Sequence, residues 1–265
     1  MNPTLSIIIP CYKSEATLPE TLASVLAQDF ESWEAIIVND GSPDQLEEVA
    51  MGWVSKDTRF RYFKKENGGL GSARNFGIQK AQGKYILPLD SDNNIKTFFP
   101  KKAIQLMEAS TEYDIVYGNA SYFGAKSGIW KMGAFNKFKL LSFNYIDACA
   151  VVRKNVFDEL GGYEENLPYQ GHEDWEFWIK CIGGEKKFYY LDKVVFEYRV
   201  LPSSMIRNFD ESMDQENENY IKQKHAHLYL ENFKPLFWQY QKWKHKSEKS
   251  FLTSLKGSIK KLIKF

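Results

Sequence analysis

The sequence contains few cysteines, and they follow no recognisable pattern. Only three occur in 265 residues, at Cys11, Cys149 and Cys181, with no Cys-x-x-Cys pair and no Cys/His ligand spacing. An odd, widely separated set argues against a disulfide framework and is typical of buried, reduced thiols. We therefore expect a cytoplasmic protein.

An excess of charge of one sign and long apolar runs are also missing. The formal net charge is +1, so no global field attracts nucleic acid, and we expect no nucleic-acid partner. No stretch approaches the roughly 18 apolar residues of a membrane-spanning helix, and the first apolar run is too short for a signal peptide. Hydrophobic residues nevertheless make up 43% of the chain, which is enough to bury a substantial core.

Phosphate-binding glycine motifs are the third absence. No Gly-x-Gly follows the first apolar run, and no Gly-x-x-x-x-Gly-Lys-Ser/Thr occurs anywhere. We therefore expect neither a dinucleotide-binding Rossmann site nor a P-loop.

Short apolar runs alternate with helical patterns as far as about residue 118. The expected strands cover 5–10, 33–40, 59–65, 84–90 and 113–118, and the expected helices cover 16–28, 42–56, 71–83 and 100–110. This alternation predicts right-handed βαβ units, and hence an α/β, Rossmann-like fold with a mostly parallel central sheet flanked by helices.

The pattern changes twice farther along the chain. Residues 118–200 are irregular and rich in aromatics, and a polar helical pattern follows. The sequence thus predicts a main domain, 1–210, and a C-terminal helical extension, 211–265. Within 247–265, apolar residues fall on one helical face and lysines on much of the rest, which favours either a membrane surface or docking on the protein itself or a partner. Both interpretations stay open.

Polar residues follow three of the expected strands. Ligands bind outside the carboxyl ends of parallel strands, so Tyr12, Asp40 and the pair Asp90 and Asp92 should share one edge of the sheet. Tyr12 either stacks a nucleobase or packs over its own loop. Asp40 either accepts a charge-assisted hydrogen bond from a base imino group or forms an Asx turn.

A glycine-rich turn, ENGGLGSARNFG, leads into the helix expected at 71–83. Backbone N–H groups at such a start attract phosphate or base oxygens, which makes Asn67 and Gly69 candidate nucleotide-binding residues. Arg74 could reach the same spot. The alternative is an ordinary turn followed by a solvated arginine.

The segment Asp90-Ser91-Asp92 ends the strand expected at 84–90. One carboxylate suits Mg²⁺ or Mn²⁺, which prefer oxygen ligands, and the other suits a ribose hydroxyl. A solvated turn that closes a buried strand is the alternative.

A strong apolar helix at 172–184 begins with two acids, Glu173 and Asp174. Acids at this position are stabilised by the helix dipole, whereas the functional interpretation is a general base that takes a proton from an incoming hydroxyl. The aromatic residues Tyr169 and Trp175 beside these acids either line a binding site or belong to the core. His172 is more typical of a helix start than of a ligand.

As an ordered set, the segments resemble glycosyltransferase family 2, whose members are inverting enzymes of the GT-A fold. The resemblance runs from about residue 4 to 205 through SIIIPCYKSE, IIVNDGSPD, ENGGLGSARNFG, YILPLDSDN, LGGYEENLPYQGHEDWEFWIK and YRVLPSSM. It implies a nucleotide-sugar donor, usually a UDP-sugar, and a saccharide or lipid-linked acceptor, as in polysaccharide assembly.

The resemblance also implies roles for the candidate residues. The implied nucleotide-binding residues are Pro10, Tyr12, Glu15, Asp40, Asn67, Gly69, Arg74, Asp90 and Ser91. Asp92 is implied as the ligand of Mn²⁺ or Mg²⁺, and Asp174 as the catalytic base. Glu173 is expected as a catalytic residue beside Asp174, near the acceptor. Tyr169, His172 and Trp175 are expected as acceptor contacts.

One position departs from the family pattern. Many members carry a histidine after the Tyr-Arg segment that helps to hold the metal or diphosphate, whereas this chain has Leu201, followed by Ser203 and Ser204. We therefore expect the metal to depend more on water and phosphate, and to bind weakly.

Two other functions fit parts of the sequence. A sugar-phosphate nucleotidyltransferase also has an α/β nucleotide-binding fold, but its early glycine-rich signature with Arg and Lys is absent. A carbohydrate-binding or assembly protein that has lost turnover is the second, and the presence of both Asp92 and Asp174 argues against it.

Overall fold

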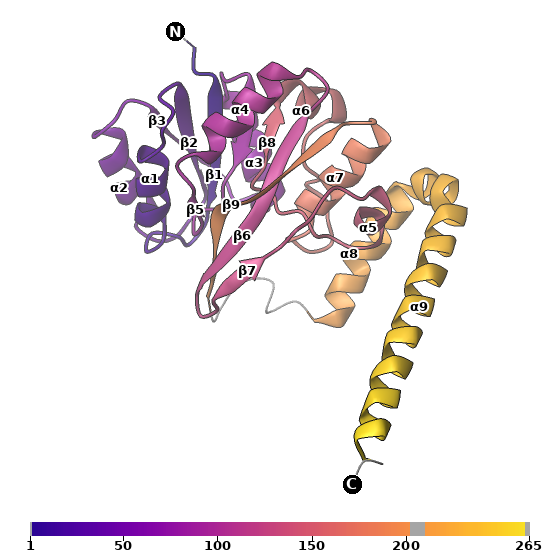
Figure 1. Ribbon diagram of the computed structural model, residues 1–265. Coiled ribbons are helices and arrows are strands. Elements are labelled where there is room, and N and C mark those ends of the chain that lie inside the picture. The colour runs from indigo at the N-terminus through magenta and orange to yellow at the C-terminus, as the bar shows by residue number, and fades with distance from the viewer. Residues whose placement is uncertain (1, 202–209, 263–265) are drawn as a thin grey trace. The chain divides into compact units, whose positions relative to one another are not determined.

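The computed structural model describes residues 2–201 and 210–262, with side chains as far as residue 246 apart from 239 and 243 (Figure 1). The chain forms two compact units, which divide between Ile221 and Lys222. The boundary after residue 210 that the sequence suggests stays a prediction. Ser203 and Ser204 lie outside the described residues.

A nine-stranded sheet runs through the described part of the first unit, in the order β3-β2-β1-β4-β8-β6-β9-β5, with β7 paired to β6. The strands are β1 Leu5–Cys11, β2 Trp33–Asp40, β3 Phe60–Lys65, β4 Tyr85–Pro88, β5 Asn94–Ile95, β6 Ile115–Gly124, β7 Gly128–Trp130, β8 Val151–Arg153 and β9 Phe188–Val200. β1 to β4 are mutually parallel, and β6 is parallel to β9, whereas β8 pairs antiparallel with β4 and β6. The predicted mostly parallel α/β sheet is therefore confirmed.

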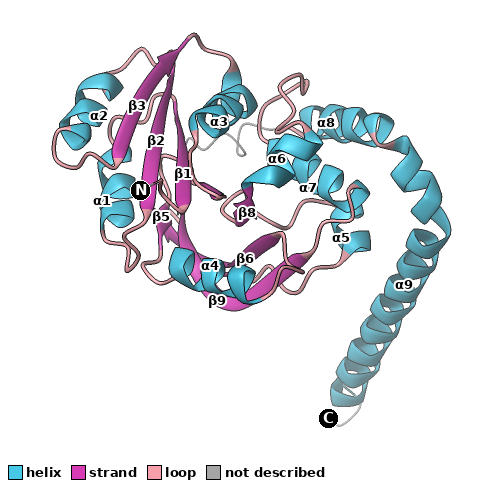
Figure 2. Ribbon diagram, turned by 90° about the horizontal axis from the view of Figure 1, so that it is seen from above, coloured by secondary structure: helices cyan, strands magenta, loops and turns pink. Residues whose placement is uncertain are grey.

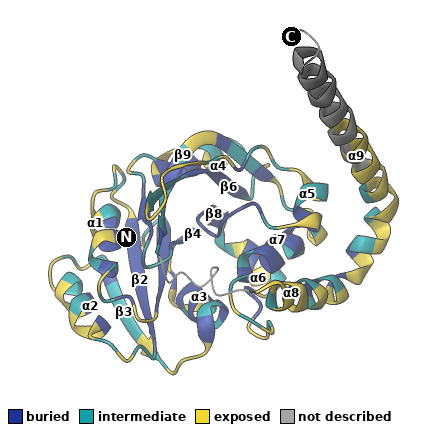
Figure 3. Ribbon diagram, turned by 90° about the horizontal axis from the view of Figure 1, so that it is seen from below, coloured by how far each residue is buried: buried dark blue, intermediate teal, exposed yellow. Residues whose placement is uncertain are grey.

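Helices cover both faces of this sheet. The helices up to the end of the first unit are α1 Leu18–Leu26, α2 Leu46–Val54, α3 Gly69–Lys80, α4 Phe99–Ala109, α5 Lys137–Ser142, α6 Lys154–Leu160, α7 Glu173–Gly183 and α8 Glu211–Lys224, the last of which continues into the second unit. Figure 2 shows α1 and α2 on one side of β1 to β3 and α3 on the other. The core strands β1 and β2 are buried along their whole length, as Figure 3 shows for β2.

Glycine lets α3 pack closely on the sheet. A Cβ atom at Gly77 would lie 2.5 Å from Ile8 Cγ2 of β1, closer than real side chains approach one another. Leaving out that Cβ lets the third turn of α3 lie against Ile8 of β1 and Val38 of β2.

The second unit consists of the end of α8 and the helix α9, Ala226–Leu262. Several large apolar residues of α9 are exposed, namely Leu230, Phe233, Phe237, Trp238 and Tyr240. The side chains of the basic tail, 247–265, lie outside the described residues. Among the described helices, none combines the length and the apolar character that crossing a bilayer requires.

Candidate active site

The ends of β1, β2 and β4 meet at one edge of the sheet, as the parallel arrangement predicts. Pro10 lies inside β1 beside Val38 of β2, and Ile8 pairs with Pro88 of β4. Burial raises the pKa of the Cys11 thiol to about 12, and the hydroxyls of Ser14 and Ser91 partly offset this rise. Because the hydroxyl of Ser91 acts on Cys11, the Asp90-Ser91-Asp92 loop lies beside the end of β1.

Asp40 is buried at the end of β2 and is held by the glycine-rich turn. Its Oδ1 accepts hydrogen bonds from Lys65 Nζ at 2.7 Å and Gly68 N at 3.0 Å, and its Oδ2 accepts one from Gly69 N at 2.8 Å. The Asn67 side chain donates to the backbone oxygen of Asp40 at 2.8 Å. The anion that the start of α3 binds in this structure is therefore the carboxylate of Asp40.

The loops after β1 and β2 are tied to each other. Lys13 N donates to Ser42 Oγ at 2.7 Å, and Gln45 N donates to Glu15 Oε2 at 2.5 Å. Lys13 has a φ of 53°, in the left-handed region, which is uncommon for a residue with a side chain. The neighbouring Tyr12 is 48% exposed, so its ring is available to a ligand at the edge of the sheet.

Arg74, in α3, connects two acidic segments. It is 3% exposed, and its Nη2 donates to Asp90 Oδ1 at 2.7 Å. Burial acts to lower its pKa, but the negative charges of Asp90, Glu173 and Asp174 outweigh burial, and the pKa ends above that of an ordinary arginine. One buried guanidinium therefore compensates the acids that follow β4 and those that begin α7.

Asp92 is fixed through its backbone. Arg199, in β9, donates from Nε to Asp92 O at 2.9 Å and from its backbone N to Asn93 Oδ1 at 2.9 Å, and it forms an ion pair with Glu20. Burial and the nearby charge of Asp90 raise the pKa of Asp92 to about 6, against the opposing effect of Arg199. The sequence did not single out Arg199, although it stands in the Tyr-Arg segment.

The carboxylate oxygens of Asp92 suit a hard cation such as Mg²⁺ or Mn²⁺. In the described part of the chain, no three His, Cys, Asp or Glu side chains gather as a complete metal site. The bonds to Arg199 use the backbone oxygen of Asp92 and not its carboxylate. Mg²⁺ and Mn²⁺ commonly bind through one or two carboxylates and take their other ligands from water and substrate phosphates, which is what this loop offers.

Glu173 and Asp174 form the first turn of α7. Asp174 is half-buried, and its Oδ1 accepts hydrogen bonds from Asn144 Nδ2 at 3.1 Å and Trp175 N at 2.7 Å. Glu173 is 2% exposed and accepts a bond from Gly171 N at 2.9 Å. Burial raises the pKa of both acids, against the attraction of the buried guanidinium described above. A raised pKa makes Asp174 a stronger proton acceptor than an ordinary aspartate.

The start of α3 packs tightly against the segment before α7. A Cβ atom at Gly71 would lie 2.4 Å from Glu164 O and 3.3 Å from Glu173 Cγ. From the same segment, Gln170 Oε1 accepts a hydrogen bond from Leu70 N at 2.9 Å. The glycine-rich turn and the helix of the candidate base therefore form one packed assembly.

Asp147 is a further acid at this site that sequence reasoning missed. It is 8% exposed, and its Oδ1 accepts a hydrogen bond from Cys149 N at 2.8 Å. Burial, and then the charges of Asp90 and Asp174, raise its pKa well above the ordinary value. The only sequence signal was an acid between apolar residues in the irregular region, and such a signal does not identify a site.

The three candidate acceptor residues have different surroundings. Trp175 is 1% exposed and its indole donates to Leu140 O at 2.6 Å, so it is a core residue and we do not retain it as an acceptor contact. Tyr169 and His172 lie in the segment before α7, and both are bonded to Asn217 of α8.

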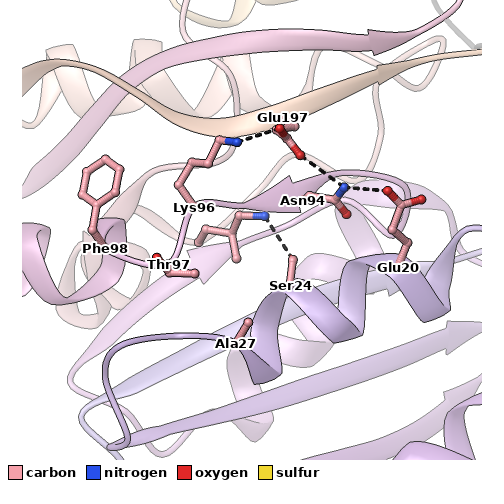
Figure 4. A pocket seen from close by; sticks show the side chains of 9 residues that line it. Glu20, Ser24, Ala27, Asn94, Lys96, Thr97, Phe98 and Glu197 are labelled. Carbon is pink, nitrogen blue, oxygen red and sulfur yellow. Dashed lines mark hydrogen bonds and ion pairs between the residues drawn. The ribbon is translucent and has the colours of Figure 1, made fainter.

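A cavity of about 370 Å³ lies beside this site, between α1 and the pair β5 and β9 (Figure 4). In it, Asn94 Nδ2 donates to Glu20 Oε1 at 2.9 Å, and Lys96 pairs with Glu197 at 2.6 Å. None of the candidate catalytic or nucleotide-binding residues lines it. We infer that these polar groups hold Glu20 in place, and Glu20 in turn forms the ion pair with Arg199.

A family model that matches more than half of the chain shows to which family the chain belongs. A model described as Glycosyl transferase family 2 matches residues 6–161. The chain belongs to glycosyl transferase family 2. The resemblance found in the sequence is thereby confirmed.

Three similar proteins are described as uncharacterised glycosyltransferases. One from Haemophilus influenzae is 30% identical over 68% of this chain and 72% of its own length. One from Rickettsia typhi is 31% identical over 78% of this chain and 65% of its own length, and one from Rickettsia felis is 32% identical over 68% and 31%. This family 2 chain thus spans less than two thirds of the Rickettsia proteins.

Solved structures confirm the GT-A-like fold. S. aureus TarS in complex with UDP-GlcNAc superposes with a TM-score of 0.66 at 19% identity, over 88% of this chain and 73% of that one. A mannosyltransferase from Pyrobaculum calidifontis in complex with GDP-Man and Mn²⁺ has a TM-score of 0.60 at 16% identity, over 77% and 59%. At such identities the likeness concerns the fold alone.

Proposed function

We propose that the protein is an inverting glycosyltransferase. It transfers a sugar from a nucleotide-sugar donor, for which a UDP-sugar is expected, to a hydroxyl of a saccharide or lipid-linked acceptor. The observation that carries this proposal is the position of Arg74. It is bonded to Asp90 at the end of β4 and interacts with Asp174 at the start of α7. A donor-side acid and a candidate base therefore belong to one site.

The donor side has a recognisable set of groups. Tyr12 offers an exposed ring for base stacking. The carboxylate of Asp40 already accepts hydrogen bonds from Lys65, Gly68 and Gly69, and its remaining acceptor position suits an imino N–H of the base. Asp90, held by Arg74, suits the ribose hydroxyls. A Mn²⁺ or Mg²⁺ ion held by Asp92 would neutralise the charge that develops on the leaving diphosphate.

The acceptor side supplies the base. Asp174 takes the proton of the acceptor hydroxyl while the hydroxyl oxygen of the acceptor forms a bond to the anomeric carbon. The bond from that carbon to the diphosphate oxygen breaks in the same displacement, and the nucleoside diphosphate leaves. A single displacement inverts the anomeric configuration and needs no nucleophile on the enzyme. Asn144, which donates to Asp174, orients the carboxylate.

The choice of donor is open to a direct test. A thermal-shift panel of UDP, GDP and dTDP sugars, with and without Mn²⁺, should show stabilisation by one nucleotide class, since a ligand that binds only the folded state raises its stability. Release of free nucleoside diphosphate identifies a transferase, whereas release of pyrophosphate identifies a nucleotidyltransferase. No stabilisation by any sugar nucleotide would refute the proposal.

We also propose that the second unit binds the cytoplasmic face of a membrane, which would favour a membrane-proximal acceptor. The exposed Phe233, Phe237 and Trp238 of α9, together with the lysines of 247–265, support a surface-binding helix. Vesicles rich in phosphatidylglycerol should pull down the full chain, and a Phe233→Ser, Phe237→Ser variant should bind less. Equal recovery of both proteins in the supernatant would count against this localisation.

A further inference from the structure

Asn217, in α8, is fully buried and is bonded to the segment that precedes α7. Its Oδ1 accepts a hydrogen bond from Tyr169 N at 2.9 Å, and its Nδ2 donates to Tyr169 O at 2.8 Å and lies 3.0 Å from His172 Nδ1. The Asn217 side chain therefore bonds both the backbone N–H and the backbone C=O of Tyr169, as a residue of a neighbouring β-strand would.

The same bonds define the state of His172. Since Nδ2 of Asn217 can donate hydrogen bonds but not accept them, His172 Nδ1 must be the acceptor in this contact. The proton of the neutral ring then lies on Nε2. That Nε2 is 3.2 Å from Asp214 Oδ1. Asp214 and Asn217 are three residues apart, on one face of α8, and together they engage both nitrogens of the ring.

His172 in turn determines where α7 begins. It is the N-cap of α7, and its backbone oxygen accepts a hydrogen bond from Glu176 N at 3.0 Å. Glu173 and Asp174 are the next two residues, so a displacement of His172 moves both carboxylates. The Tyr169–His172 segment is therefore fixed on one side by α8 and on the other by the hydrogen bond that Leu70 N of α3 donates to Gln170.

We propose that Asn217 is a positioning residue for Asp174, acting through Tyr169 and His172. This inference rests on the proposed role of Asp174 as the base. Asn217 lies after the residues that the family model matches, 6–161, so family membership does not assign it. Misplacing a reacting group by about 1 Å can cost on the order of 10²-fold in rate, which makes a fully buried clamp next to the base consequential.

Three variants test the proposal. Asn217→Ala removes the clamp, Asn217→Asp keeps its shape and loses both N–H donors, and Asn219→Ala is the control on the same helix, at an exposed residue bonded only to Gln215 among the described contacts. We expect both Asn217 variants to lower the kcat of transfer by roughly 10- to 100-fold. Donor Kd by calorimetry should stay within about two-fold, since Asn217 touches no donor-side residue. A role in packing alone predicts wild-type kcat for Asn217→Asp.

Hydrogen exchange separates this inference from the proposed function. In both Asn217 variants the amides of residues 165–175 should lose protection, while those of β1 and β2 keep it. Unchanged protection in that segment, or lost protection with unchanged kcat, would overturn the positioning role. If the wild type transfers no sugar, or Asp174→Asn transfers normally, it is the proposed function that fails.

Discussion

The guanidinium of Arg74 donates to the carboxylate of Asp90 across 2.7 Å, and the arginine is 3% exposed. This ion pair joins α3 to the loop after β4, and the same positive charge faces the acids at the start of α7. The site is thus organised around one buried cation.

Replacing Arg74 with alanine should destabilise the protein and abolish donor binding. The substitution leaves Asp90 and Glu173 without their nearest counter-charge, and breaking a buried pair typically costs about 3–5 kcal/mol. Urea denaturation measures this loss. The exposed pair of Lys84 with Glu108 provides the control, since Lys84→Ala should cost less than about 1 kcal/mol. Equal losses for the two variants would contradict the role given to Arg74.

Metal binding should weaken as the solution becomes more acidic. Asp92 has a raised pKa of about 6, and a proton on its carboxylate competes with the cation. The apparent affinity for Mn²⁺ in the presence of nucleoside diphosphate should therefore be constant above about pH 7 and fall by up to roughly tenfold per unit below pH 6. Calorimetric titrations from pH 5 to 8 measure this, and a flat profile would exclude Asp92 as the ligand.

Replacing Asp147 with asparagine should stabilise the metal-free protein at high pH. The pKa of Asp147 is raised on folding, so the folded state binds its proton more tightly than the unfolded state. The contribution of this group to stability is present at low pH and is lost as the pH rises above the ordinary aspartate value of about 4. The carboxamide that Asp147→Asn introduces can still accept the bond from Cys149 N but cannot ionise.

Thermal denaturation at pH 5 and pH 8 tests that prediction. The melting temperature of Asp147→Asn should exceed that of the wild type by a few degrees at pH 8, and the difference should shrink at pH 5. A difference that grows toward low pH would show that the direction of the pKa shift is wrong.

The fold and the position of Tyr12, Asp40 and Asp90 at one edge of the sheet were predictable because each depends on local pattern. Apolar runs ending in Tyr12, Asp40 and Asp90 are enough to place these residues at one edge of a parallel sheet. The sequence predicted phosphate or base oxygens at the start of α3, and that ligand stays a prediction. It could not show that backbone N–H groups of this turn already bind the carboxylate of Asp40.

The acceptor side was less predictable because its contacts join distant segments with no periodic pattern. Asn144 bonds to Asp174, and Asp147 feels its charge, from an irregular region of the chain. Asn217 bonds to His172 from a polar helix, and polar residues are common in both places. Trp175 shows the opposite difficulty, since its position beside the acids suggested a sugar contact, yet helical geometry turns its ring into the core. Only the packing of α5, α7 and α8 distinguishes these cases.

The central claim is that Asp174 is the base of a sugar transfer. The most direct measurement is the rate of nucleoside diphosphate release with Mn²⁺, donor and acceptor, for the wild type and Asp174→Asn, with donor binding followed by calorimetry. We predict that the variant binds donor within about three-fold of the wild type and loses roughly 10²- to 10⁴-fold in kcat. Turnover that is unchanged in Asp174→Asn would contradict the account.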